Sequence, residues 1–135
     1  YDLTPVLCVG EALEVREAGT HVDFTLEQLR GSIAGLSAKQ AETLVVAYEP
    51  VWAIGTGKVA TADDAQEMSA AIRAEFEKLY STDVAQKVRI LYGGSVKSSS
   101  APSIMGKEDV DGVLVGGASL QAEEFAKQQI VLKGV

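Results

Sequence analysis

The sequence predicts an α/β fold built on a parallel sheet, with about four βα units in 135 residues. Apolar runs alternate with helix-periodic segments from one end of the chain to the other, which is the order of βα units. The runs are apolar at consecutive positions, as expected of strands buried on both faces of a parallel sheet. Because no linker interrupts this order, we expect residues 1–135 to form a single domain without an internal boundary.

Each predicted strand is a short apolar run that is followed by glycine or a polar residue. The four runs cover residues 5–9, 44–48, 88–92 and 112–115. Cys8, the only cysteine, lies inside the first run and cannot form an internal disulfide. We therefore expect it to be a small buried hydrophobic side chain.

The segments between the strands have the spacing of amphipathic helices. One apolar stripe consists of Leu26, Leu29, Ile33 and Leu36, and a second consists of Ala65, Met68, Ile72, Phe76 and Leu79. Thr61 and Asp64 form a capping-box pattern before the second stripe. Residues 98–106 contain Pro102 and predict a brief helix, and residues 123–132 predict the last helix.

Composition and charge exclude several classes of partner. The net charge of −7 argues against nucleic acid, since a basic surface is needed to replace phosphate counterions. No apolar run is long enough to cross a bilayer, and the amino end lacks a signal-peptide pattern, so we expect no membrane contact and a cytoplasmic location. The chain begins with Tyr1, close to an apolar run, and we expect it to start within a fold.

The residues that follow the strands favour a barrel over an open sheet. They are Gly10-Glu11, Glu49-Pro50, Gly93-Gly94-Ser95 and Gly116-Gly117. In an open sheet the ligand lies mainly at one switch point, whereas in an eight-unit barrel all the carboxyl ends of the strands meet at one mouth. The pattern therefore predicts part of a barrel.

Glu49 and the loop after it suggest chemistry at this mouth. Glu49 directly follows an apolar run and precedes Pro50, so its carboxylate leaves a rigid strand, although a glutamate in that position can also be merely solvated. Residues 50–60 combine bulky apolar side chains with glycines, which is typical of a lid that covers a ligand. The Gly-Gly pairs can either direct N–H groups at an anion or form only tight turns.

Three strings in this chain resemble triose-phosphate isomerases. Residues 47–57 (AYEPVWAIGTG) resemble the segment of that family that carries the base and the lid, and residues 92–96 (YGGSV) and 111–120 (DGVLVGGASL) follow in the right order. Residues 8–11 resemble the end of the family's fifth strand. The resemblance covers nearly the whole chain, and implies the carboxy-terminal half of a TIM barrel, strands five to eight.

The resemblance implies an aldose-ketose isomerase of glycolysis and gluconeogenesis. Dihydroxyacetone phosphate and glyceraldehyde 3-phosphate would be interconverted through an enediolate, with Glu49 as the proton-abstracting base. The phosphate would be bound by Gly55 of the lid, by Ser95, and by Gly116 and Gly117. We expect no metal or organic cofactor, because the substrate's own carbonyl delocalises the charge.

The lid is expected to be held by a latch. The indole N–H of Trp52 needs a hydrogen-bond partner, and Glu11, at the end of the neighbouring strand, is the nearest candidate acceptor. Tyr92 and Ser95 are expected to bond to the far end of the lid backbone. In the family, a lysine and a histidine that would precede this chain also act in catalysis, and neither Lys58 at the lid hinge nor His21 at a helix start replaces them.

A further ion pair is expected to join successive units of the fold. Arg73 lies on the capped helix, and Asp109 and Asp111 lead into the last strand. These charges can also be separately solvated at the surface.

Two alternative functions remain open. The chain could be a stand-alone half-barrel that binds phosphate esters or serves in assembly without catalysis, or it could belong to another phosphate-binding barrel enzyme. A base coupled to a long apolar lid favours catalysis, because a binding module needs no base. The expected partners are a triose phosphate, the missing amino-terminal half of the barrel and, for the complete enzyme, a second copy in a homodimer. Alone, the chain is expected to be inactive.

Overall fold

Four parallel strands form the sheet, and their order in space is their order along the chain. They are β1 (Val6–Val9), β2 (Val45–Tyr48), β3 (Arg89–Tyr92) and β4 (Gly112–Val113). This is a computed structural model, in which residues 1–129 are described. It confirms the predicted α/β fold. Neighbouring strands in sequential order fit a sector of a TIM barrel, since a doubly wound sheet reverses its strand order at a switch point.

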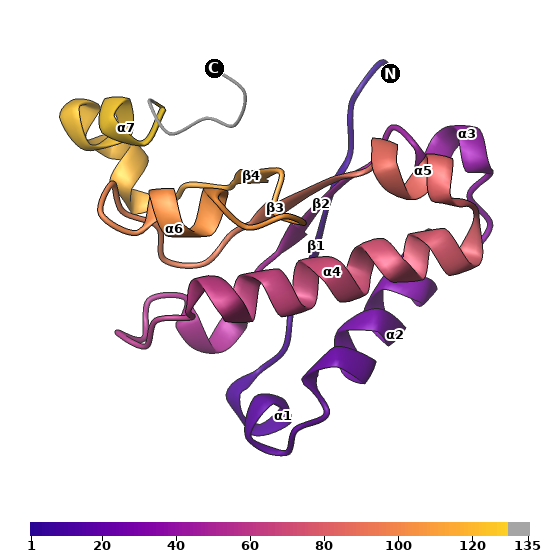
Figure 1. Ribbon diagram of the computed structural model, residues 1–135, viewed down its shortest axis with the longest axis horizontal. Helices are drawn as coiled ribbons and strands as arrows, with labels where there is room; N and C mark the ends of the chain where they lie inside the picture. Colours follow the sequence, from indigo (N-terminus) through magenta and orange to yellow (C-terminus); the bar gives the residue numbers. More distant parts are fainter. Residues whose placement is uncertain (130–135) are drawn as a thin grey trace.

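Helices fill the connections between the strands. They are α1 (Leu13–Glu17), α2 (His21–Ile33), α3 (Ala38–Ala41), α4 (Ala62–Leu79), α5 (Thr82–Lys87), α6 (Ala101–Met105) and α7 (Ala122–Gln129), with single turns of 3-10 helix at η1 (Val51–Ala53) and η2 (Gly117–Leu120). Figure 1 shows α2 and α4 side by side, and the two helices contact each other. Their apolar faces bury the sheet on that side.

The capped helix α4 is the longest element and confirms most of the predicted stripe. Thr61 and Asp64 form both hydrogen bonds of the capping box. Four members of the stripe, Ala65, Met68, Ile72 and Phe76, are fully buried. Leu79, predicted to be buried with them, is 44% exposed instead. The reason is that α4 ends there, and Tyr80 rather than Leu79 stacks on Phe76, with 6.1 Å between the ring centroids.

The predicted link between successive units is present. The Arg73 guanidinium bonds to the Asp109 carboxylate through Nε at 2.9 Å and to the Asp111 carboxylate through Nη2 at 2.7 Å. It also donates to the backbone carbonyls of Ala85 and Asp109. Asp111 in turn accepts the N–H of Ile90 in β3. Arg73 therefore holds α4 against the segment that leads into β4.

Burial differs between the centre and the edge of the sheet. All four residues of β2 are buried, because β1 and β3 flank this strand. At the edge, Val6 is 48% exposed and Cys8 is also exposed, so the prediction that Cys8 is buried was wrong. The apolar run correctly indicated a strand, but in the described part of the chain β1 has a neighbour on only one side.

In the last third of the chain, the described helices and the strand are shorter than the ranges that the sequence predicts. The brief helix predicted at residues 98–106 is α6, and Pro102 fits its first turn, where the backbone N–H has no helical partner. β4 ends at Val113, whereas a strand was predicted to residue 115. The last helix is confirmed as α7 as far as Gln129, and the remainder of the predicted range lies outside the described residues.

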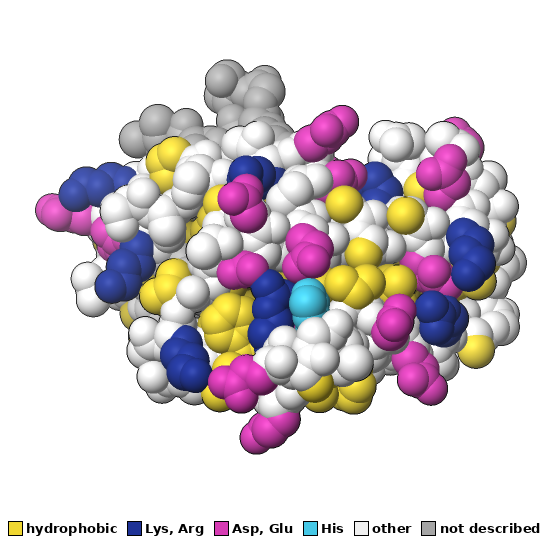
Figure 2. Space-filling view, turned by 60° about the horizontal axis from the view of Figure 1, so that its bottom comes forward, with side chains coloured by type: hydrophobic (Ala, Val, Ile, Leu, Met, Phe, Trp, Pro, Cys, Tyr) yellow, Lys and Arg dark blue, Asp and Glu magenta, His cyan; other side chains and the backbone are white. Residues whose placement is uncertain are grey.

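The helical face of the molecule carries charges of both signs. Figure 2 shows Lys and Arg side chains interspersed with Asp and Glu side chains on this face, rather than gathered into one basic patch. Within residues 1–129, none of the helices combines the length and the apolar character required to span a membrane.

Candidate active site

A cavity of about 400 Å³ lies at the carboxyl ends of the strands. Its lining includes Glu49 after β2, Gly55 in the following loop, Ser95 after β3, and Gly116 and Gly117 after β4. These are all of the residues expected to act on the substrate or its phosphate. Three separate strand ends thus converge on one space of a size common for small-molecule sites.

Glu49 is held tightly between the ends of two strands. Its backbone N–H donates to the Val9 carbonyl at 2.8 Å, and the N–H of Gly93 donates to the Tyr48 carbonyl at the same distance. A Cβ atom on residue 93 would lie 2.7 Å from Cγ and 3.2 Å from Oε1 of Glu49. Only glycine at position 93 therefore leaves room for the Glu49 side chain in this orientation.

Cys8 is a neighbour of the Glu49 carboxylate. Although the residue as a whole is exposed, desolvation raises the pKa of the thiol, and a hydrogen bond to Glu49 and the charge of that carboxylate raise it further. A thiol with a raised pKa stays neutral at pH 7. The Cys8 thiol therefore adds no negative charge beside the Glu49 carboxylate at that pH.

The loop from residue 50 to residue 60 has the features expected of a lid. It begins with η1, which is attached to the end of β1 by a hydrogen bond from the Val51 N–H to the Glu11 carbonyl at 3.0 Å. Gly55 follows with a positive φ of 68°, a conformation that favours glycine. Ile54, which lines the cavity, and Val59 are apolar yet exposed. Closure of the loop over a ligand could bury such side chains.

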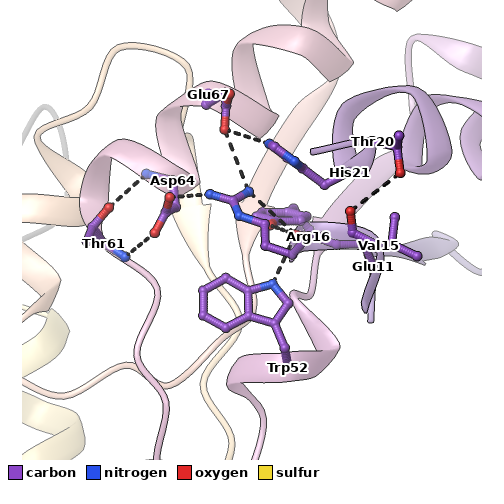
Figure 3. A network of polar contacts seen from close by, with 10 residues as sticks. Glu11, Val15, Arg16, Thr20, His21, Trp52, Thr61, Asp64 and Glu67 are labelled. Atoms are coloured by element: carbon purple, nitrogen blue, oxygen red, sulfur yellow. Dashed lines mark hydrogen bonds and ion pairs between the residues drawn. The ribbon is translucent and has the colours of Figure 1, made fainter. Parts of the chain in front are cut away.

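Glu11 is fully buried and accepts hydrogen bonds from two aromatic side chains. Its Oε1 atom lies 3.0 Å from the Tyr48 hydroxyl. The same atom lies 3.0 Å from the indole Nε1 of Trp52 (Figure 3). Burial, followed by the charge of Glu11, raises the pKa of Tyr48. The structure thus contains the Trp52–Glu11 hydrogen bond that was expected, and its role as a latch stays a prediction.

Arg16 of α1 extends this network to the other end of the loop. Its guanidinium carbon lies 5.6 Å from the centroid of the Trp52 ring, and the group forms an ion pair with Asp64, the partner of the N-cap Thr61 in the capping box of α4 (Figure 3). Glu67 lies 3.6 Å from Arg16 and 3.0 Å from His21 Nε2. Arg16 therefore joins the start of the loop to the helix that follows its end.

Two expected contacts to the lid are not formed. Tyr92 is buried, and its hydroxyl has no hydrogen-bond partner in the described part of the chain. Burial, with a smaller contribution from the charge of Asp64, raises the pKa of Tyr92 to about 12. Within residues 1–129, no hydrogen bond joins Ser95 to the lid. Contacts of Tyr92 and Ser95 with the lid stay predictions for its closed state.

Several glycines line the cavity, and their backbone N–H groups are available as candidate donors. Gly116 is the N-cap of η2, and the first N–H groups of a helix have no partner within the helix, so they can bind an anion. Lys97 also lines the cavity and adds an ammonium group that strand-end reasoning missed. Among the described residues, no group of three or more His, Cys, Asp or Glu side chains is placed to hold a metal ion.

Comparison with known proteins gives the family. The family model for triosephosphate isomerase matches residues 1–131. The triosephosphate isomerase of Streptomyces coelicolor is 63% identical over 127 residues, which cover 94% of this chain and 49% of that protein. The triosephosphate isomerase of Nocardia farcinica is 58% identical over 134 residues, covering 99% of this chain and 51% of that protein. The chain spans about half the length of the curated relatives it matches, and it belongs to the triosephosphate isomerase family.

Proposed function

We propose that this chain is the carboxy-terminal half of a triosephosphate isomerase barrel, a single unit that supplies strands five to eight. The substrates are dihydroxyacetone phosphate and glyceraldehyde 3-phosphate. The observation that carries the proposal is the single cavity that Glu49 shares with Gly55, Ser95, Gly116 and Gly117. Family membership supports the choice of a triose phosphate as the substrate.

Glu49 is the base in this proposal. Its carboxylate removes a proton from the carbon next to the substrate carbonyl, and the electron pair of the C–H bond passes to the carbonyl oxygen to give an enediolate. The same carboxyl group returns the proton to the adjacent carbon, which had carried the carbonyl, while a proton passes from the hydroxyl oxygen on the first carbon to the former carbonyl oxygen. The placement of Glu49 against Gly93 supports this role, because proton transfer requires a fixed base within hydrogen-bonding reach of the reacting carbon.

The phosphate is bound by the lid and by the loops after β3 and β4. Gly55, Ser95, Gly116 and Gly117 line the same cavity and are proposed to donate backbone N–H groups to the phosphate, with Lys97 beside them. Such local donors can bind an anion to a protein whose net charge is −7. Trp52 and Glu11 fix the start of the lid, and Tyr92 is a contact for its closed form.

Catalysis in this proposal needs the other half of the barrel. The lysine and histidine that the family resemblance implies would come from strands one and four, and they would stabilise the enediolate charge. Apolar side chains are exposed at both edges of the sheet, including Val6 in β1 and Leu114 after β4. Their exposure supports a second half of the barrel that covers both edges. The complete enzyme is a homodimer that acts in the cytoplasm, and the isolated chain is inactive.

Turnover of a Glu49→Gln variant of the complete barrel tests this function. Glutamine keeps the size of the side chain but cannot accept the proton, so kcat is expected to fall by roughly 10²–10⁴ or more with a small change in KM. Glu17→Gln is the matched control. Glu17 is exposed on α1, and its substitution removes the same charge away from the cavity. Near-normal kcat for Glu49→Gln would contradict the assignment, and phosphate binding without turnover in the unaltered protein would favour the non-catalytic alternative.

A further inference from the structure

A glutamate at the start of α7 is bound to the loop after β3 by two hydrogen bonds. The backbone N–H of Ser98 donates to Oε1 of Glu124, and the Ser98 hydroxyl donates to Oε2 at 3.0 Å. Both carboxylate oxygens are therefore used by one residue of another segment. A bidentate, charge-assisted contact of this kind fixes orientation as well as distance.

The two segments that this contact joins both reach the candidate active site. Ser98 follows Ser95 by three positions, and Glu124 follows η2, which begins at Gly117 with Gly116 as its N-cap. A second cavity of about 380 Å³ separates Lys97, Ser98 and Ser99 from Gly117 and Ala118. Across this gap, no other side-chain hydrogen bond joins residues 93–99 to residues 116–129 of the described chain.

The charge of Glu124 is unfavourable for an anion-binding site. A carboxylate near a phosphate raises the free energy of the bound state, so attraction of the substrate cannot be its function. The hydrogen bonds from the Ser98 backbone and side chain lower the pKa of Glu124, so the group stays ionised at neutral pH. Its neighbour Glu123 is exposed, with no side-chain hydrogen bond or ion pair in the described chain, which shows that this helix can carry a charge without such a contact.

We propose that Glu124 is a positioning residue, which holds the β3 loop and the β4 loop at the separation that a substrate phosphate requires. This inference rests on the proposed function. Ser95 on one loop and Gly116 and Gly117 on the other must donate to the same phosphate group, and Glu124 fixes the distance between the two loops through Ser98. Loss of the contact allows the loops to separate across the second cavity.

The test compares Glu124→Gln with Glu123→Gln in the complete barrel. Both variants lose one negative charge on the same helix, but only the first alters the contact with Ser98. For Glu124→Gln, the KM for triose phosphate and the inhibition constant for inorganic phosphate are expected to rise about three- to tenfold, with kcat nearly unchanged. Ser98→Ala, which removes only the hydroxyl donor, is expected to give a smaller rise in the same direction.

The sign of the change separates positioning from charge. If Glu124 acted only as an unfavourable charge, Glu124→Gln would lower KM and the inhibition constant for phosphate, and this result would overturn the proposal. A fall in thermal stability with both constants unchanged would show a merely structural role and would also overturn it.

Amide hydrogen exchange keeps the test independent of activity. The Ser98 N–H is expected to exchange at least about tenfold faster in Glu124→Gln than in Glu123→Gln, because its acceptor is weakened. Faster exchange at Ser98 together with weaker binding of inorganic phosphate supports the positioning role. Absence of isomerase activity in the unaltered protein would count against the proposed function and not against this inference. Unchanged exchange at Ser98 would overturn the inference.

Discussion

Substitution of Gly93 by alanine tests whether the β3 loop positions the carboxylate of Glu49, the proposed base. A Cβ atom on residue 93 would lie 2.7 Å from Cγ of Glu49, whereas ordinary van der Waals contacts begin at about 3.4 Å. The two carbons must therefore separate by several tenths of an ångström. The backbone cannot easily supply this movement, because the N–H groups of Gly93 and Glu49 both form strand-end hydrogen bonds of 2.8 Å. The Glu49 side chain has to move.

A displacement of this size has a large effect on proton transfer. A shift of about 1 Å in a reacting group can cost roughly 10²-fold in rate, so for this somewhat smaller shift we expect kcat of Gly93→Ala in the complete barrel to fall by roughly 10- to 10²-fold. Overpacking at the site is expected to lower stability by about 1–3 kcal/mol as well. Steady-state kinetics and urea unfolding of the same sample measure both effects.

Gly112→Ala is the matched control for this substitution. Its added Cβ atom would lie 2.8 Å from Cδ2 of Leu91, a similar overlap that a rotation at the end of the leucine side chain can relieve away from Glu49. We expect its kcat to stay within about threefold of the unaltered protein. If Gly93→Ala and Gly112→Ala lowered kcat equally, the loss would reflect general strain, and the reasoning about Glu49 would be refuted.

Three further predictions concern stability and need no substrate. Burial raises the folded-state pKa of Tyr92 from about 10 to about 12, so its contribution to stability is full below pH 10 and is lost as the pH rises towards 12. Tyr92→Phe should therefore flatten the fall in the free energy of unfolding, measured with urea, between pH 10 and pH 12. An unchanged slope would contradict this. A double-mutant cycle of Arg73→Ala and Asp111→Ala should give a coupling of at least about 0.5 kcal/mol, and additivity would exclude the link. Gly31→Ala in α2 should stabilise the protein by about 0.5–1 kcal/mol, since the added methyl group meets nothing within 4 Å; destabilisation would argue against the helix geometry there.

The sequence could predict the fold and the cavity residues because both depend on local order. Consecutive apolar runs indicated parallel strands, and the residues after each run had to meet at one end of the sheet. Glu49, Ser95 and Gly116 therefore line one cavity without any need to know the packing in detail. The capping box of α4 was equally local, since its two residues are three positions apart.

The parts that the sequence did not predict depend on contacts between distant segments. The ion pair of Arg16 with Asp64 joins residues 48 positions apart, and the hydrogen bonds of Ser98 to Glu124 join residues 26 positions apart, so no spacing rule indicates either contact. Cys8 was wrongly expected to be buried, because an apolar run predicts a strand but not whether that strand has neighbours on both sides.

The central claim is that this chain supplies the base and the phosphate-binding loops of a barrel that needs a second half. The most direct measurement is isomerase activity of the purified chain, alone and after refolding with a polypeptide that supplies the first four βα units. We expect no activity from the chain alone, activity from the mixture, and none from a mixture made with Glu49→Gln. Turnover by the chain alone as a monomer, or full activity in the Glu49→Gln mixture, would contradict the claim.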